Sequence, residues 1–390
     1  MTSLTPLASA VASYADRMHA ALGGGQQVAS PLGAGLVLAL ASRGSRGPAR
    51  ARLGDMLGMD VDEAAAAASH LLCAPHPAVA TALAIWHRAE FATPGLTVWQ
   101  RALPEPVERG PVPGQAAVDE WARRSTFGLI ERFPLHMTGN TALVLVSALA
   151  SRISWVQPFN LAPAADLGSG GWASRLGQVL RTPESGHAAF IARTSRAGIV
   201  AAHTARSRDG VFVTSVVADA SVQAADVLAA AHEVALTASP PRVSLFDLQL
   251  GDGPLWTITE QRVPLSLPRE ERCAAVVPAW KANSSHDLGA PQLGFGEAGR
   301  ALTGLLRPGR YQSEARQAAM ACYDRTGFEA AAVTGTGVQA SVMRQRSPGL
   351  LREALLRFGH PYAVVAVCRD GQWDGLPVFS AWVTSPSPAE

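Results

Sequence analysis

The feature that most constrains the fold of this chain is a run of small residues near its C-terminal end, residues 327–337. Its apolar residues follow neither the 3.6-residue period of a helix nor a clear alternation, so its composition predicts an exposed segment. In an extended conformation, however, four small side chains would share one face. These are Ala330, Ala332, Thr334 and Thr336. The run can therefore form a buried strand as well as a loop, which indicates a segment that changes state.

The remaining composition excludes several classes of protein. The chain has 390 residues, of which 48% are hydrophobic and 16% charged, so a large core is expected. A formal net charge of +2 gives no reason to expect binding to nucleic acid or to an acidic membrane. No apolar run approaches the roughly 18 residues of a membrane span, and residues 5–22 read as an amphipathic helix rather than a signal peptide. We therefore expect a soluble, cytoplasmic protein.

The sequence contains no pattern typical of a catalytic, cofactor or metal site. Its four cysteines are far apart and include no Cys-x-x-Cys pair, and its ten histidines are scattered without the spacing of a metal-binding helix. A nucleophile elbow, a phosphate-binding loop and a His-Glu-x-x-His motif are all missing from the sequence. We predict no cofactor, no metal and no catalytic residue.

Residues 325–334 read Arg-Thr-Gly-Phe-Glu-Ala-Ala-Ala-Val-Thr. This segment resembles the hinge of the serpin reactive loop, whose usual form is Glu-Glu-Gly-Thr-Glu-Ala-Ala-Ala-Ala-Thr. The two acidic residues and the first threonine of that form are replaced here. The resemblance assigns the hinge to seven residues: Gly327, Phe328, Glu329, Ala330, Ala331, Ala332 and Thr334.

Other segments resemble serpins in the same order along the chain, from about residue 5 to residue 386. They include a Ser-Pro helix start at Ser30, a near-continuous apolar strand at 141–148 that we expect to be buried on both faces, and a C-terminal strand at 378–383. Between them we predict a strand at 79–88 that leads into a turn at 93–95, and a helix at 117–133.

The resemblance implies a prokaryotic-type member of the family with the α+β serpin fold. We expect one domain over residues 1–390, with a main mixed β-sheet, two smaller sheets, eight or nine helices, an exposed reactive loop at about 325–350 and a disordered tail at 387–390. It also implies a monomeric inhibitor of a serine or cysteine protease, rather than an enzyme. In such inhibitors the protease cuts the loop, whose N-terminal half then inserts into the main sheet as a strand and distorts the attached protease.

The position of the cut bond stays open. The usual family spacing from Phe328 leads to Ser341-Val342, whereas Arg344 or the Arg346-Ser347 bond would suit a trypsin-like protease. Five extra residues add about 17 Å of slack between the sheet and the protease, because an extended chain spans about 3.3 Å per residue. With slack in the connection, the attached protease can complete hydrolysis. A cut at Ser341-Val342 therefore favours inhibition, and a cut at Arg346 favours behaviour as a substrate.

Two departures from the family pattern support an alternative function. Phe328 occupies the first inward position, where overpacking typically costs about 1–3 kcal/mol, unless it anchors the base of the loop. Of the family's polar cluster for sheet opening, only one of four residues is retained. The alternative is therefore a non-inhibitory serpin scaffold, used as a binding protein or a small-molecule enzyme. The residues assigned to sheet opening are Ser30, Gly33, Ser147, Gln317 and, at the top of the main sheet, Trp155.

Overall fold

A computed structural model describes residues 6–328 and 347–389, and shows the predicted α+β class with eight α-helices among those residues. The chain forms two compact units, each built from three separate stretches of sequence. Unit 1 comprises residues 1–152, 282–321 and 366–381, and unit 2 comprises residues 153–281, 322–365 and 382–390.

Unit 1 contains seven of the eight described helices. The second of them begins as the sequence predicts, because Ser30 caps it by accepting a hydrogen bond from the Gly33 N–H, and Pro31 lies in its first turn. The third ends at Gly58, whose φ of +71° is accessible to glycine at little cost. The helices of unit 1 are α1 (Pro6–Leu22), α2 (Pro31–Ser42), α3 (Gly47–Leu57), α4 (Val61–Cys73), α5 (Pro94–Arg101), α6 (Gln115–Ser125) and α8 (Phe295–Thr303).

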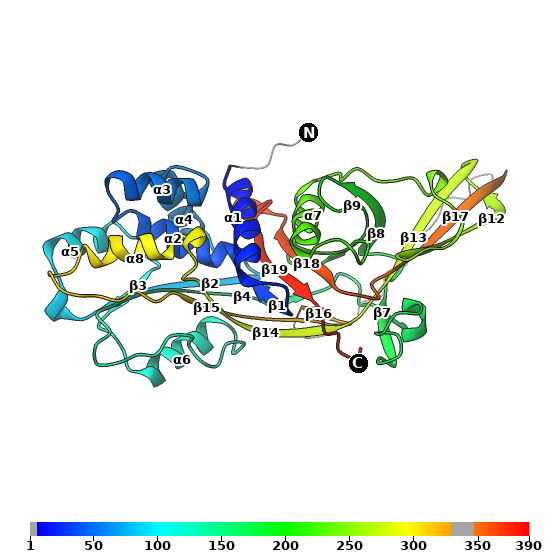
Figure 1. The fold of residues 1–390 in the computed structure, drawn as a ribbon. Helices are drawn as coiled ribbons and strands as arrows, with labels where there is room; N and C mark the ends of the chain where they lie inside the picture. Colours follow the sequence, from blue (N-terminus) through cyan, green and yellow to red (C-terminus); the bar gives the residue numbers. More distant parts are fainter. Residues whose placement is uncertain (1–5, 329–346, 390) are drawn as a thin grey trace. The chain divides into compact units, whose positions relative to one another are not determined.

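The strands of unit 1 form two separate groups. Strand β2 (Val79–His87) pairs with β3 (Glu108–Gly110) on one side and with β4 (Leu143–Ser151) on the other. Strand β14 (Trp280–Asp287) pairs with β15 (Arg316–Tyr323), and most of both strands lies in this unit. In Figure 1, α6 lies on one side of the β2–β4 strands, and α2 and α8 lie on the other. A short strand, β1 (Gln27–Ala29), precedes α2.

Three expectations about unit 1 were wrong. The helix expected at 117–133 ends at Ser125, because Phe127 and Gly128 take positive φ values of 55° and 83°. The segment at 93–95 begins α5 instead of forming a turn, since the Thr93 side chain accepts a hydrogen bond from the Leu96 N–H and so caps the helix. Much of the first half of strand β4 is only half-buried, because its side chains line a cavity.

One sheet of unit 2 is an antiparallel series of three strands, β8 (His187–Thr194), β9 (Gly198–Arg206) and β10 (Val211–Val217). Helix α7 (Ala224–Leu236) packs against β10. Strands β18 (Tyr362–Cys368) and β19 (Pro377–Val383) extend this sheet, and each has residues in both units. All residues of these two strands are buried, which agrees with their continuous apolar sequences.

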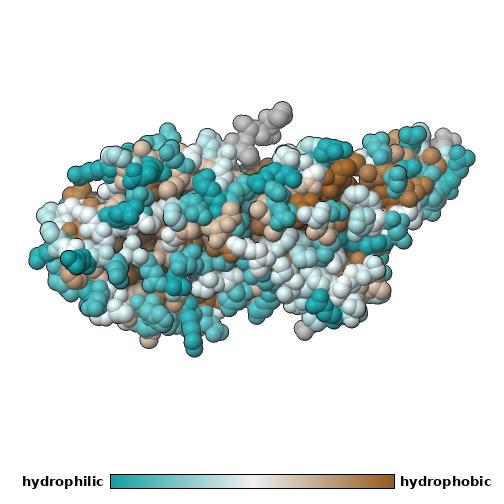
Figure 2. All heavy atoms as spheres, in the orientation of Figure 1, coloured by the Kyte–Doolittle hydropathy of each residue, from teal (hydrophilic) through white to brown (hydrophobic). Residues whose placement is uncertain are grey.

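The second sheet of unit 2 has six strands in the order β11-β12-β17-β13-β7-β6. Figure 2 shows apolar side chains gathered over the strands that Figure 1 labels β13 and β17. The strands are β11 (Gly251–Asp252), β12 (Trp256–Leu265), β17 (Ser347–Arg357), β13 (Arg269–Val277), β7 (Gln178–Arg181) and β6 (Asn160–Pro163).

Two further features of unit 2 concern its chain ends and connections. Strands β5 (Ile153–Ser154) and β16 (Gly327–Phe328) form a two-residue antiparallel pair.

At the C-terminus the structure differs from the expected disordered tail, because the Ser387 N–H donates a hydrogen bond of 2.7 Å to the Ala279 carbonyl and Ala389 is buried.

Candidate functional site

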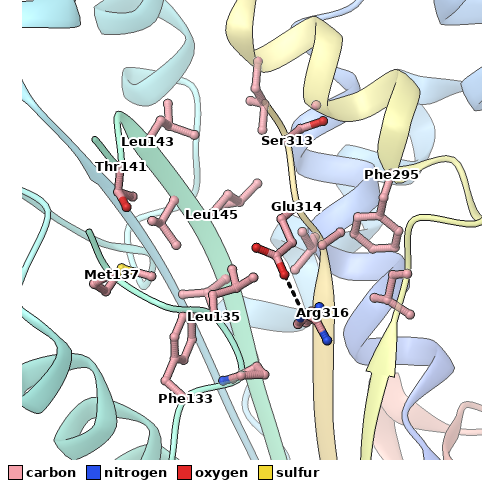
Figure 3. Close-up of a pocket in the computed structure, with 18 of the residues that line it drawn as sticks. Phe133, Leu135, Met137, Thr141, Leu143, Leu145, Phe295, Ser313, Glu314 and Arg316 are labelled. Carbon is pink, nitrogen blue, oxygen red and sulfur yellow. Dashed lines mark hydrogen bonds and ion pairs between the residues drawn. The ribbon is translucent and has the colours of Figure 1, made fainter. Parts of the chain in front are cut away.

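Unit 1 contains a cavity of about 830 Å³ between β4 and the segment that leads into β15. In Figure 3, Leu143 and Leu145 of β4 lie on one side of it, and Glu314 and Arg316 lie on the other. The connection between α6 and β4 and one end of α8 complete its apolar lining. These residues are Phe133, Leu135, Met137 and Phe295.

The cavity is bordered by two strand edges that lack partners. Among the described residues, β4 pairs only with β2, and β15 pairs only with β14. Backbone N–H and C=O groups on such edges can accept another strand. The side chains of Leu143 and Leu145 are half-buried because they line this opening, which explains why β4 is less buried than its sequence predicts. The site therefore has both the apolar walls and the free backbone groups that an added strand requires.

Four of the predicted sheet-opening residues lie together at the start of α2. Gln317 accepts a hydrogen bond from the Ser30 N–H and donates one to the Ser30 carbonyl, both at 2.9 Å. The Ser147 hydroxyl donates to the Gly33 carbonyl at 2.8 Å. In the described part of the chain, no hydrogen bond joins Ser147 to Gln317. Strands β4 and β15 are thus each attached to α2 and not to one another, which leaves the edges between them free. The role of these residues in sheet opening stays a prediction.

Trp155 holds the chain just before the predicted hinge. Its indole N–H donates to the Asp324 carbonyl at 3.0 Å, and its backbone N–H donates to the Thr326 carbonyl at 3.1 Å. The Asp324 carboxylate in turn accepts hydrogen bonds from the N–H groups of Thr326 and Gly327. Sequence reasoning missed Asp324, although an Asp with a glycine three residues later is a known signal for this kind of turn. The predicted position of Trp155 above the main sheet stays a prediction.

A pair of histidines lies in the same aromatic cluster as Trp155. His187 and His203 share a hydrogen bond of 3.2 Å between their rings, and Phe159 packs against both. The Gln157 carbonyl can only accept a hydrogen bond, so Nε2 of His187 carries a proton and donates to it at 2.7 Å. The Nδ1 atom of His187 must then accept from His203 Nε2, which leaves His203 Nδ1 without a proton.

Burial sets the charge of these two rings. It lowers the pKa of His187 to about 4 and lowers the pKa of His203 well below its usual value. Both rings are therefore neutral at pH 7. The sequence did not indicate this pair, because the two residues are 16 positions apart and meet only through the β8–β9 register, which places Ala189 opposite His203.

The chain beyond the predicted cut is held much more extensively. Strand β17 is internal to its sheet, antiparallel to β12 and parallel to β13. The turn between those two strands crosses over the start of β17. A Cβ atom on Gly349 would lie 2.8 Å from the carbonyl oxygen of Leu267 and 2.9 Å from that of Pro268. Only glycine fits there without a shift of the crossing turn.

Most of the predicted hinge and cut bonds lie outside the described residues. The structure places Gly327 and the backbone of Phe328 in β16, and Ser347 at the start of β17. The predicted residues that lie outside are Glu329, Ala330, Ala331, Ala332, Thr334, Ser341, Val342, Arg344 and Arg346.

Within residues 6–328 and 347–389, no group of three or more His, Cys, Asp or Glu residues could hold a metal ion. No helix in that part of the chain is long and apolar enough to cross a membrane.

Comparisons with known proteins identify solved structures with the same fold. No family model and no curated protein matches the sequence. Serpin48 from the insect Tenebrio molitor is 16% identical, with a TM-score of 0.65 over 98% of both chains. Native tengpin, a thermophilic serpin, is 12% identical, with a TM-score of 0.66 over 97% of this chain and 93% of its own. Thyroxine-binding globulin in complex with thyroxine is 13% identical, with a TM-score of 0.65 over 98% of this chain and all of its own.

Proposed function

We propose, from the premise that this chain has the serpin fold, that it is a serpin-type inhibitor of a serine or cysteine protease. In this proposal the protease cuts within residues 329–346, and the N-terminal part of that segment inserts between β4 and β15. The observation that carries the proposal is the cavity between two free strand edges in unit 1. An inserted strand would fill the cavity and pair with both edges.

The pairing of β16 with β5 predicts the register of the inserted strand. Phe328 lies opposite Ile153, and β5 follows β4 after a single residue. If the same antiparallel register continues, each step forward from Phe328 is one step back along β4. Ala332 would then lie opposite Leu149, Thr334 opposite Ser147, and residue 338 opposite the first residue of β4.

This register also predicts which side chains are buried. Ser147 points toward α2, because its hydroxyl donates to the Gly33 carbonyl. Residues directly opposite one another on paired strands share a face. Thr334 and the other even-numbered residues along β4 would therefore point toward α2. Four of these five residues are small, Ala330, Ala332, Thr334 and Thr336, and the fifth is Val338.

The same register bears on the cut bond. A strand that pairs along all of β4 ends near residue 338, so Ser341 would lie three residues beyond it and Arg346 eight residues beyond it. The shorter connection holds an attached protease closer to the end of the sheet. We therefore propose Ser341-Val342 as the inhibitory bond, and Arg344 and Arg346 as positions where cutting ends in hydrolysis.

Incubation with a panel of serine and cysteine proteases tests this function. We expect at least one protease to form a complex that survives a denaturing gel. Thr334→Arg should convert the protein to a substrate that is only nicked, because a charge would be buried without a partner. Thr334→Ala keeps the residue small and should preserve the complex. Nicking without a complex by every protease that attacks the wild-type segment would contradict the proposal.

The cavity also supports a second candidate. Its volume of about 830 Å³ lies within the range of small-molecule sites, and its walls are largely apolar. One protein of this fold is solved as a complex with thyroxine. A non-inhibitory scaffold that binds an apolar ligand is therefore the function that nicking without a complex would favour.

A further inference from the structure

The turn between β12 and β13, residues 265–269, lies beside the chain that an attacking protease must hold. Leu265 is directly opposite Ser347, the first residue of β17. The Leu350 N–H donates a hydrogen bond of 2.9 Å to the Pro268 carbonyl, where the turn crosses the strand. Residues 347 and 348, which follow the Arg346-Ser347 bond, are thus the first two residues beside this turn.

Protease footprints are large enough to include the turn. A standard protein interface covers about 800 Å² on each partner, a patch roughly 30 Å across. The Ser341-Val342 bond is five residues from Ser347, so the chain between them spans at most about 17 Å. A protease centred on either bond would therefore cover the turn with the part of its surface that binds the residues after the cut.

The turn presents one apolar side chain with a basic border. Leu267 is 62% exposed, whereas Leu265 beneath it is buried. Arg262 and Arg269 flank the turn, both opposite Leu350 in the register of β17, and both are exposed. Neither arginine forms an ion pair with a carboxylate among the described residues. An apolar side chain between two guanidinium groups fits a partner surface with an apolar patch bordered by carboxylates.

The backbone of the turn is fixed before any partner binds. The Ser266 N–H donates to the Glu270 carboxylate at 3.1 Å. The guanidinium of Arg269 lies over the Phe246 ring, 5.0 Å from its centroid. Prolines at positions 264 and 268 restrict the backbone on both sides of Leu267. Since little conformational freedom remains to be lost, contact with this turn is favourable for binding.

We infer that residues 265–269 form a second contact surface for the protease, with Leu267 as its apolar anchor. This inference rests on the proposed function in that the partner is a protease that attacks residues 329–346. Recognition then extends beyond the cut segment. The protease carries an apolar patch with an acidic border, next to the site where it binds the residues that follow the cut.

The test uses the protease of the panel that attacks the segment fastest. The measured quantity is the second-order rate constant for attack, which counts covalent complex and nicked product together. We expect Leu267→Ala to lower it about tenfold, the usual size for the loss of an anchoring residue. Leu267→Met should keep most of the wild-type rate. Leu250→Ala is the matched control, because Leu250 is 50% exposed on the same sheet next to β11, which pairs with the far end of β12.

A second measurement tests the basic border. Added salt should slow the attack on the wild-type protein, and Arg262→Ala should reduce this salt dependence. A Leu267→Ala rate equal to that of Leu250→Ala, at unchanged melting temperatures, would overturn the inference. A rate that depends on Leu267 while no covalent complex forms would refute inhibition and leave the contact surface supported. No cut within residues 329–346 by any protease would overturn both.

Discussion

The two ends of the segment 329–346 are attached to unit 2 in very different ways. At the N-terminal end, β16 has two residues, which pair on one side with β5. At the C-terminal end, β17 pairs with β12 from Ser347 to Leu356, and with β13 from Leu350 to Arg357. One end is a short strand with few ladder bonds, and the other is an internal strand under a turn.

This difference indicates what a cut in the segment would release. Each backbone hydrogen bond contributes on the order of 1 kcal/mol net, so removing β17 from between two partners would cost several kcal/mol. Extending β16 breaks no such sheet. Under the proposed function, a cut would free the N-terminal side to extend along β4, while β17 would stay in place. Without a cut, β17 would restrain the segment, so the proposed insertion depends on the protease.

Lowering the pH should weaken the N-terminal attachment, and we expect this to be the largest effect on either attachment. The pKa of His187 falls from its ordinary 6.5 to about 4 on folding, and the pKa of His203 falls as well. The unfolded chain thus binds more protons than the folded chain between these values, so stability is lost as the pH falls from 6.5 to 4. The free energy of unfolding should decrease by on the order of 3 kcal/mol over that window.

Denaturant unfolding at several pH values measures this effect. The His187→Phe variant removes one of the two titrating groups and keeps an aromatic ring, so its stability should depend less on pH in the same window. An equal decrease in the wild-type protein and in this variant would show that other groups are responsible.

Gly349→Ala tests the C-terminal attachment. A methyl group there would meet two carbonyl oxygens of the crossing turn at less than 3 Å. We expect a loss of about 2 kcal/mol in the free energy of unfolding, a typical cost for such overpacking. Gly25→Ala is the control, because a Cβ atom at Gly25 has no heavy atom within 4 Å. If the two variants are equally stable, the turn does not confine β17 as described.

Asp324→Ala should have the smallest effect. The variant removes the acceptor for the Thr326 and Gly327 N–H groups in a partly exposed turn, for a loss of about 1 kcal/mol in the free energy of unfolding. Asp324→Asn retains an acceptor oxygen and should lose less than half as much. Equal losses in both variants would indicate that the charge of Asp324, and not its turn, matters.

Much of the fold could be predicted from local sequence. The Ser30 cap and the apolar C-terminal strand β19 depend on neighbouring residues, and the structure confirms them. The helix expected to reach residue 133 ends early because Phe127 has a positive φ. Apolar periodicity does not reveal this local feature.

The candidate site was less predictable because it depends on distant contacts. The bonds between Gln317 and Ser30 join residues 287 positions apart, and the histidine pair depends on strand register. The need for glycine at position 349 follows from a turn about 80 residues earlier in the chain. The resemblance to serpins predicted the hinge and the sheet-opening residues, but not that β17 would be enclosed on both sides.

Thermal unfolding of intact and nicked protein tests the central claim most directly. A single cut between residues 337 and 346 should allow insertion, which pairs two free strand edges and buries the apolar walls of the cavity. With an unfolding entropy of about 2.1 cal/mol/K per residue, a net gain of about 5 kcal/mol raises the melting temperature by roughly 6 °C when 390 residues unfold together. We predict a rise of at least about 5 °C for the nicked wild-type protein and none for nicked Thr334→Arg. A nicked wild-type protein that melts at or below the temperature of the intact protein would contradict the account.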